Sequence, residues 1–129
     1  KADILFSHGY TEEALKFYKK SSYEYPLNYY AKIRIFENIE IKNLSSSDIE
    51  TIFQENKELL YKYFNNKNIL FKYIELAQEL NKKEWLSFFN FVLSINDIEK
   101  EVFDIDIKTF KSTKDSDLLK LVNIIENVN

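Results

Sequence analysis

The chain has 129 residues with one glycine, one proline, no cysteine and a formal net charge of −3. Glycine and proline punctuate turns, bulges and phosphate-binding loops, so this composition argues against a β-sandwich, a doubly wound nucleotide fold or a phosphate cradle. The lack of cysteine excludes a disulfide framework and a thiol-redox site. The acidic balance, with Arg34 as the single arginine, argues against nucleic-acid binding.

The composition favours a single all-α domain over residues 1–129. Hydrophobic residues make up 45% of the chain and charged residues 30%, which suits both a core and a solvated surface. Lys1 opens directly into a helical pattern, so we expect a fragment of a longer chain. Its compartment stays open between the cytoplasm and a periplasmic or membrane-tethered location. The bias toward lysine, asparagine and isoleucine is typical of a low-GC bacterial genome.

Apolar residues recur at helical spacing along most of the chain. Residues 1–8 are predicted to end a helix that Gly9 closes, and Thr11 begins a second helix that Pro26 stops. A third helix is predicted over residues 29–42. Its apolar positions are Ile33, Phe36, Ile39 and Ile41.

A capping box begins the helix that follows a polar break at 43–46. The Ser47 hydroxyl can accept from the backbone amide three residues on, and Glu50 can reach back to the cap. The apolar face behind this box continues to Phe64 and predicts one helix. Another amphipathic helix is predicted from Ile69 to Leu80.

The helix predicted over 82–96, whose start Asn81 and Glu84 signal, is apolar around most of its circumference. Such a helix is buried or meets a partner, and its uncharged run is too short to span a bilayer. Residues 103–108 alternate with period two, but a lone strand lacks a backbone partner. We therefore expect an extended connection or a short irregular helix there. With a last helix over 118–128, the count is about eight.

The first helix pair resembles a tetratricopeptide repeat, a helix–turn–helix unit of about 34 residues. The similarity covers residues 2–28 and includes the turn glycine, the small residue at the helix crossing, the aromatic one turn later and the closing proline. These repeat-packing residues are Gly9, Ala14, Tyr18 and Pro26. A small crossing side chain lets two helices approach closely, and the aromatic fills the gap to the next pair.

The resemblance implies antiparallel helix pairs stacked as a right-handed superhelix. Residues 1–42 would form the repeat-like unit and the helix after it. In the next unit Asn43 stands in the place of the turn glycine and Asp48 in that of the crossing alanine. Residues 43–129 are therefore expected to be degenerate helical repeats or a plain helical bundle.

In proteins that this chain resembles, ligands lie in a groove lined by the first helix of each repeat. Tyr30, Arg34 and Glu37 follow one another at i, i+4 and i+7 on such a helix, with Phe6 beside them from the preceding unit. These four residues are the expected partner-binding set. The Asn and Lys pattern by which some family members clamp a peptide carboxylate is not present in this sequence, so such a ligand is not assumed.

An aromatic cluster on the 82–96 helix is the alternative interface. Its members are Trp85, Phe88, Phe89 and Phe91. Aromatic stripes of this kind are found more often in a core than in a partner groove, and both interpretations remain open from the sequence.

Catalytic constellations are sparse in this chain. His8 is the single histidine, and one histidine with scattered carboxylates does not make a metal site or a triad. Two acidic pairs, Asp104 with Asp106 and Asp115 with Asp117, are better explained as loop or helix-cap carboxylates than as acid–base pairs. We expect no enzyme activity, no metal and no cofactor.

The sequence therefore predicts a non-catalytic module that binds another protein through a helical groove or an aromatic end-face. One alternative is an accessory helical domain of a larger enzyme, such as a glycosyltransferase. Another is self-assembly through the 82–96 helix. No nucleic-acid partner and no membrane span within this chain are expected.

Overall fold

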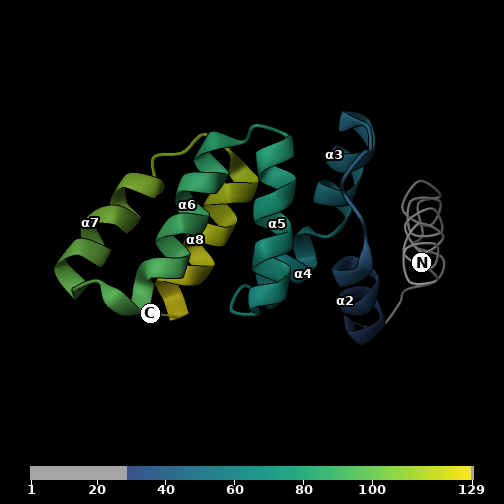
Figure 1. Ribbon diagram of the computed structural model, residues 1–129. Coiled ribbons are helices and arrows are strands. Elements are labelled where there is room, and N and C mark those ends of the chain that lie inside the picture. The colour runs from purple at the N-terminus through teal and green to yellow at the C-terminus, as the bar shows by residue number, and fades with distance from the viewer. Residues whose placement is uncertain (1–28, 129) are drawn as a thin grey trace. The chain divides into compact units, whose positions relative to one another are not determined.

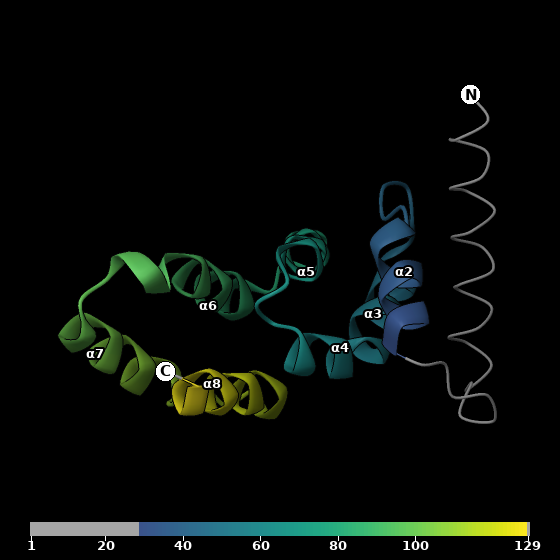
Figure 2. The same ribbon diagram turned by 90° about the horizontal axis from the view of Figure 1, so that it is seen from below.

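The computed structural model describes residues 29–128, with side chains from Lys32 onward (Figures 1 and 2). All regular elements within this range are helical: seven α-helices and one short 3-10 helix, with no strand. The all-α prediction is thus confirmed for the described residues. The expected helix pair of Gly9, Ala14, Tyr18 and Pro26 lies outside them, as does His8.

The chain divides into two compact units between Asn81 and Lys82. The described part of the first unit holds α2 (Tyr29–Asn38), α3 (Ser46–Glu55), α4 (Lys57–Lys62) and α5 (Lys67–Glu79). Helix α5 packs against the other three, and Figure 1 shows these helices from blue to teal.

The core of the first unit forms around one tyrosine of α5. The Tyr73 ring lies 5.2 Å from that of Phe36 in α2 and 5.0 Å from that of Phe53 in α3, between ring centroids. Its hydroxyl donates a hydrogen bond of 2.7 Å to the Phe53 carbonyl oxygen. The other buried apolar side chains include Ile39, Ile41, Ile49, Ile52, Leu59, Leu60, Ile69, Leu70, Leu76 and Ala77.

Helix α3 begins two residues before the predicted position. The N-cap is Ser45 rather than Ser47, and its hydroxyl oxygen accepts from the Asp48 amide at 3.1 Å. Three consecutive serines can each supply this cap, and the first one does so. Ser47 lies within the helix, where its carbonyl accepts a hydrogen bond from the Thr51 hydroxyl.

The single helix predicted to run to Phe64 is broken at Asn56. This residue has φ −109° and ψ 7° and separates α3 from α4. Its side chain is 2% exposed and donates from Nδ2 to the Ile52 carbonyl at 2.8 Å. Asparagine competes with the helical backbone for hydrogen bonds, which explains a break that the apolar pattern does not show.

The second unit holds α6 (Lys83–Ser94), the 3-10 helix η2 (Ile95–Asp97), α7 (Lys100–Phe110) and α8 (Ser116–Val128). These helices appear from green to yellow in Figures 1 and 2. Its core is largely aromatic: Phe88 and Phe91 of α6 pack against Phe110, and Phe91 also packs against Phe103. Helix α8 adds Leu118, Leu121, Val122 and Ile125 to the buried set.

Residues 103–108 form part of the regular helix α7 instead of the expected extended connection or short irregular helix. Phe103 and Ile107, at i and i+4, are buried, whereas Ile105 between them is 66% exposed. The period-two pattern therefore contained two core residues on one helical face and an isoleucine on the outer face.

Asn81 ends a helix and does not begin one. It follows the C-cap Leu80 of α5 with a left-handed φ of 56°, the conformation that asparagine tolerates at this position. Glu84, the second half of the predicted start signal, accepts a hydrogen bond from the Thr113 hydroxyl at 2.8 Å.

Candidate functional site

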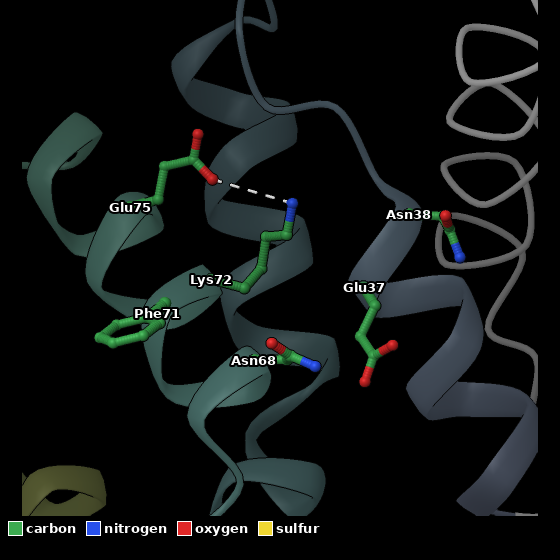
Figure 3. Close-up of a pocket in the computed structure, with 6 residues that line it drawn as sticks. All are labelled: Glu37, Asn38, Asn68, Phe71, Lys72 and Glu75. Atoms are coloured by element: carbon green, nitrogen blue, oxygen red, sulfur yellow. Dashed lines mark ion pairs between the residues drawn. The ribbon is translucent and has the colours of Figure 1, made fainter. Parts of the chain in front are cut away.

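A groove lies between α2 and α5 in the first unit (Figure 3). Its volume is about 390 Å³, within the usual range of ligand-binding sites. Helix α2 contributes the end of its last turn and helix α5 contributes one face. The lining residues are Glu37, Asn38, Asn68, Phe71, Lys72 and Glu75.

The face that α5 presents to the groove follows from helical periodicity. Asn68, Phe71, Lys72 and Glu75 are spaced i, i+3, i+4 and i+7, so they form one stripe along the helix. The core residues of α5 occupy the neighbouring stripe. The start of the helix is fixed by Asn66, whose side-chain oxygen accepts from the Asn68 and Ile69 amides at 3.0 and 3.4 Å.

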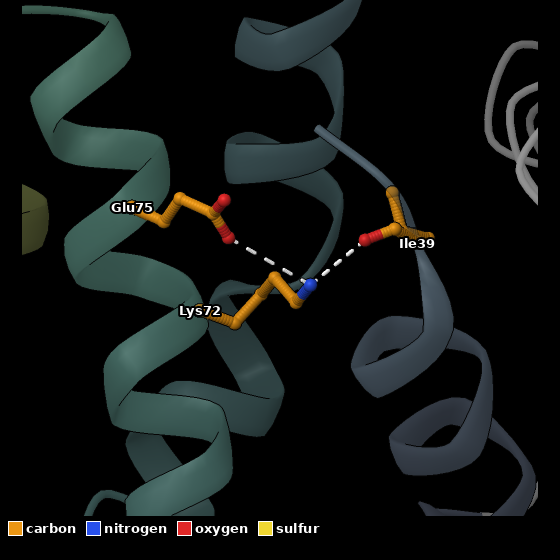
Figure 4. A network of polar contacts seen from close by, with 3 residues as sticks. All are labelled: Ile39, Lys72 and Glu75. Atoms are coloured by element: carbon orange, nitrogen blue, oxygen red, sulfur yellow. Dashed lines mark hydrogen bonds and ion pairs between the residues drawn. The ribbon is translucent and has the colours of Figure 1, made fainter. Parts of the chain in front are cut away.

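Lys72 is the basic residue of the lining, and its ammonium group is engaged (Figure 4). Its Nζ donates to the Ile39 carbonyl oxygen at 2.8 Å and lies 3.8 Å from Oε1 of Glu75. The last turn of α2 has no basic residue of its own. Lys72 therefore places a positive charge near the C-terminal end of α2, where such a charge stabilises the helix dipole.

The polar groups contributed by α2 are mainly acceptors. Asn38 donates from Nδ2 to the Arg34 carbonyl at 2.7 Å, which leaves its Oδ1 as the acceptor end of the amide. The Glu37 carboxylate lines the groove and has no ion pair with another described residue. Figure 3 shows Glu37 and Asn68 extending from opposite helices toward the space between them.

The structure brings one member of the predicted partner-binding set to the groove. Glu37 lines it, whereas Arg34 is exposed on α2 and lies outside the lining. Tyr30 belongs to α2, but its side chain lies outside the described part, and Phe6 lies outside the described residues altogether.

The aromatic residues of the alternative interface lie in the core of the second unit. Trp85, Phe88, Phe89 and Phe91 are all buried, with Trp85 5.8 Å from Phe89 and Phe88 5.8 Å from Phe91 between ring centroids. Of the two interpretations of this cluster, core and partner interface, the burial of all four side chains supports the core. Among the exposed large apolar side chains of the described range are Phe71 in the groove and Ile105 on α7.

Asp115, which the sequence analysis paired with Asp117, caps the N-terminus of α8. Its Oδ1 accepts from the Asp117 and Leu118 amides at 3.0 and 3.1 Å, and its Oδ2 accepts from Nε1 of Trp85 at 2.9 Å. Burial raises the pKa of Asp115, but these hydrogen bonds and the nearby charge of Lys82 outweigh it, so the pKa lies below its ordinary value. All of these contacts stabilise the ionised carboxylate, as expected for a helix cap and not for an acid–base pair.

No group of three or more potential metal ligands occurs in the described part of the chain. Between residues 29 and 128, no helix has the length and hydropathy needed to cross a membrane. Both statements concern the described range alone.

Sequence reasoning missed five of the six lining residues. Asn38, Asn68, Lys72 and Glu75 are polar and read as part of a solvated surface. Phe71 carried the available signal, because it is a large aromatic residue placed outside the apolar stripe of α5 and it is 52% exposed. An aromatic residue on the polar face of an amphipathic helix indicates a contact surface.

Comparison of the chain with protein-family models, with curated proteins and with solved structures found no match.

Proposed function

We propose that this chain is a non-catalytic protein-binding domain whose groove between α2 and α5 holds a segment of a partner protein. The observation that carries the proposal is the groove itself, in which an exposed aromatic residue, Phe71, lies beside five polar side chains. Aromatic anchors with polar neighbours are typical of protein interfaces.

The size of the groove suits a short stretch of chain. A volume of about 390 Å³ accommodates one or two side chains with their backbone. The walls are supported from behind, because Phe36 of α2 and Tyr73 of α5 pack against each other in the core. A wall fixed in this way loses little conformational entropy when a ligand binds.

The stacked, repeat-like arrangement of helix pairs belongs to the same proposal. Helix pairs that stack in this way present extended concave surfaces for partners. The groove between α2 and α5 would be part of such a surface, and the resemblance at residues 2–28 supports this part of the proposal.

Peptide display on the full chain tests the proposal. Peptides selected on the wild type are counter-screened on Phe71→Ser, which removes the aromatic anchor without opening the core because Phe71 is exposed. Leu93→Ser is the matched control, because it changes another exposed apolar residue to a polar one, in the second unit. We expect enriched peptides whose affinity falls about tenfold on Phe71→Ser and is unchanged on Leu93→Ser.

Two outcomes would contradict the proposal. One is the absence of any enriched peptide, and the other is a set of peptides that bind Phe71→Ser as well as the wild type. Thermal unfolding of both variants within a few degrees of the wild type would show that the comparison concerns the surface and not folding.

A further inference from the structure

The groove carries more negative than positive charge. Its lining contains two carboxylates, Glu37 and Glu75, and one ammonium, Lys72. Lys72 donates to the Ile39 carbonyl and lies beside Glu75, whereas the Asn68 amide can both donate and accept. What distinguishes the groove for a ligand is therefore the negative charge of Glu37.

We infer that the partner segment is anchored in this groove by an arginine side chain. The inference rests on the proposed function and names the chemistry of the partner. A guanidinium group carries five N–H donors in one plane and keeps its charge. It can form two parallel hydrogen bonds with the Glu37 carboxylate, which lies in the groove between the two helices (Figure 3).

The alternatives fit the lining less well. A carboxylate or phosphate ligand would face Glu37 and Glu75, and its natural counter-charge, Lys72, is already paired with Glu75 and hydrogen-bonded to α2. A lysine ammonium is a point charge and cannot form the two parallel hydrogen bonds that a guanidinium makes with a carboxylate.

Phe71 accounts for the rest of the binding surface. In Figure 3 Asn68 and Lys72 lie between Phe71 and Glu37, so the ring forms the outer edge of the groove. An apolar side chain next to the arginine in the partner segment can pack on this ring. The structure thus favours a segment in which an arginine neighbours an apolar residue.

The decisive experiment uses isotopically labelled full chain and three small probes. N-acetyl-arginine methylamide, its citrulline counterpart and its lysine counterpart are titrated while the side-chain amide signals of Asn38 and Asn68 are followed by NMR. Citrulline has the shape of arginine without its charge. We expect the arginine probe to shift both amide signals and to bind about tenfold more tightly than the citrulline probe, since a hydrogen bond to a charged group is involved.

Glu37→Gln removes one charge from the groove and keeps the size of the side chain. Glu79→Gln, an exposed residue of the same helix pair outside the lining, makes the same change of net charge elsewhere. Affinity for the arginine probe is expected to fall about fivefold or more on Glu37→Gln and to stay unchanged on Glu79→Gln. Equal binding of arginine and citrulline, or equal effects of the two variants, would overturn the inference.

The outcomes separate this inference from the function on which it rests. If displayed peptides depend on Phe71 but none needs its arginine, the groove is a peptide site and the arginine anchor is wrong. If no displayed peptide depends on Phe71, the proposed function fails and the arginine anchor fails with it.

Discussion

The hydrogen bond between Trp85 and Asp115 gives a sharp test of how the second unit is held together. The Trp85 ring is 2% exposed, and its indole N–H donates to Oδ2 of Asp115 at 2.9 Å. The same carboxylate caps α8 through Oδ1. Asp115→Ala removes both interactions at once, since a methyl group neither accepts from the indole nor caps the helix.

The magnitude follows from adding two known costs. Loss of an N-cap costs about 1 kcal/mol, and a buried donor left without an acceptor costs about 1 to 3 kcal/mol. Asp115 itself is partly exposed, so water can replace some of the lost acceptor. We therefore expect Asp115→Ala to lower the free energy of unfolding by about 2 kcal/mol.

Asp115→Asn is the matched control, because the single oxygen of asparagine can keep the N-cap while its NH2 group cannot accept from the indole. It is expected to cost about half as much as the alanine variant at neutral pH. Since the folded pKa of Asp115 is lowered, the charged form contributes stability that is complete above the ordinary aspartate pKa. That contribution is lost as the pH falls through the folded pKa. The stability difference between wild type and Asp115→Asn should therefore shrink in acid.

Urea unfolding followed by tryptophan fluorescence measures these differences directly, because Trp85 is the only tryptophan of the chain. Equal losses for the alanine and asparagine variants would show that the cap retained by asparagine does not stabilise the second unit, and that the charge or the second oxygen of Asp115 does. A loss below about 0.5 kcal/mol for Asp115→Ala would refute the assignment of the cap and the indole bond as stabilising contacts.

Three further substitutions test other contacts by urea unfolding. Tyr73→Phe removes the donor to the Phe53 carbonyl and is expected to cost about 1 to 2 kcal/mol; no change would mean that another donor satisfies this carbonyl. Asn81→Gly should be neutral or stabilising while Asn81→Ala costs about 1 kcal/mol, and equal effects would contradict the left-handed backbone. Lys72→Met should cost about 1 kcal/mol through loss of the bond to the Ile39 carbonyl, whereas an unchanged midpoint would show that α2 ends without this support.

The fold class was accessible from the sequence because helical periodicity is a local property. Ile49, Ile52 and Phe53, at spacings of three and four, predict a buried face, and all three are buried. The interruptions were less accessible. Asn56 separates α3 from α4, and its side chain donates to the Ile52 carbonyl. The sequence shows an asparagine on an apolar face, but it does not show whether that side chain will bond to its own backbone.

Alternation over 103–108 failed as a predictor for a related reason. Period two and period 3.6 share the positions i and i+4, here Phe103 and Ile107, so a short segment cannot separate them. The intervening Ile105 decides the matter only when its exposure on α7 is known. Ile105 is apolar, as a core residue would be, but it lies on the exposed face of α7.

The groove was out of reach of sequence reasoning because its two walls come from helices far apart in the chain. Lys72 and the Ile39 carbonyl are 33 residues apart, and their contact links the end of α2 to the middle of α5. The end of α2 lacks a basic residue of its own, and α5 supplies one. The lysine that stabilises α2 is thereby occupied, and Glu37 is left without a counter-charge among the described residues. The negative character of the groove is thus a consequence of how the first unit is stabilised, and a positively charged partner side chain is the group that would balance it.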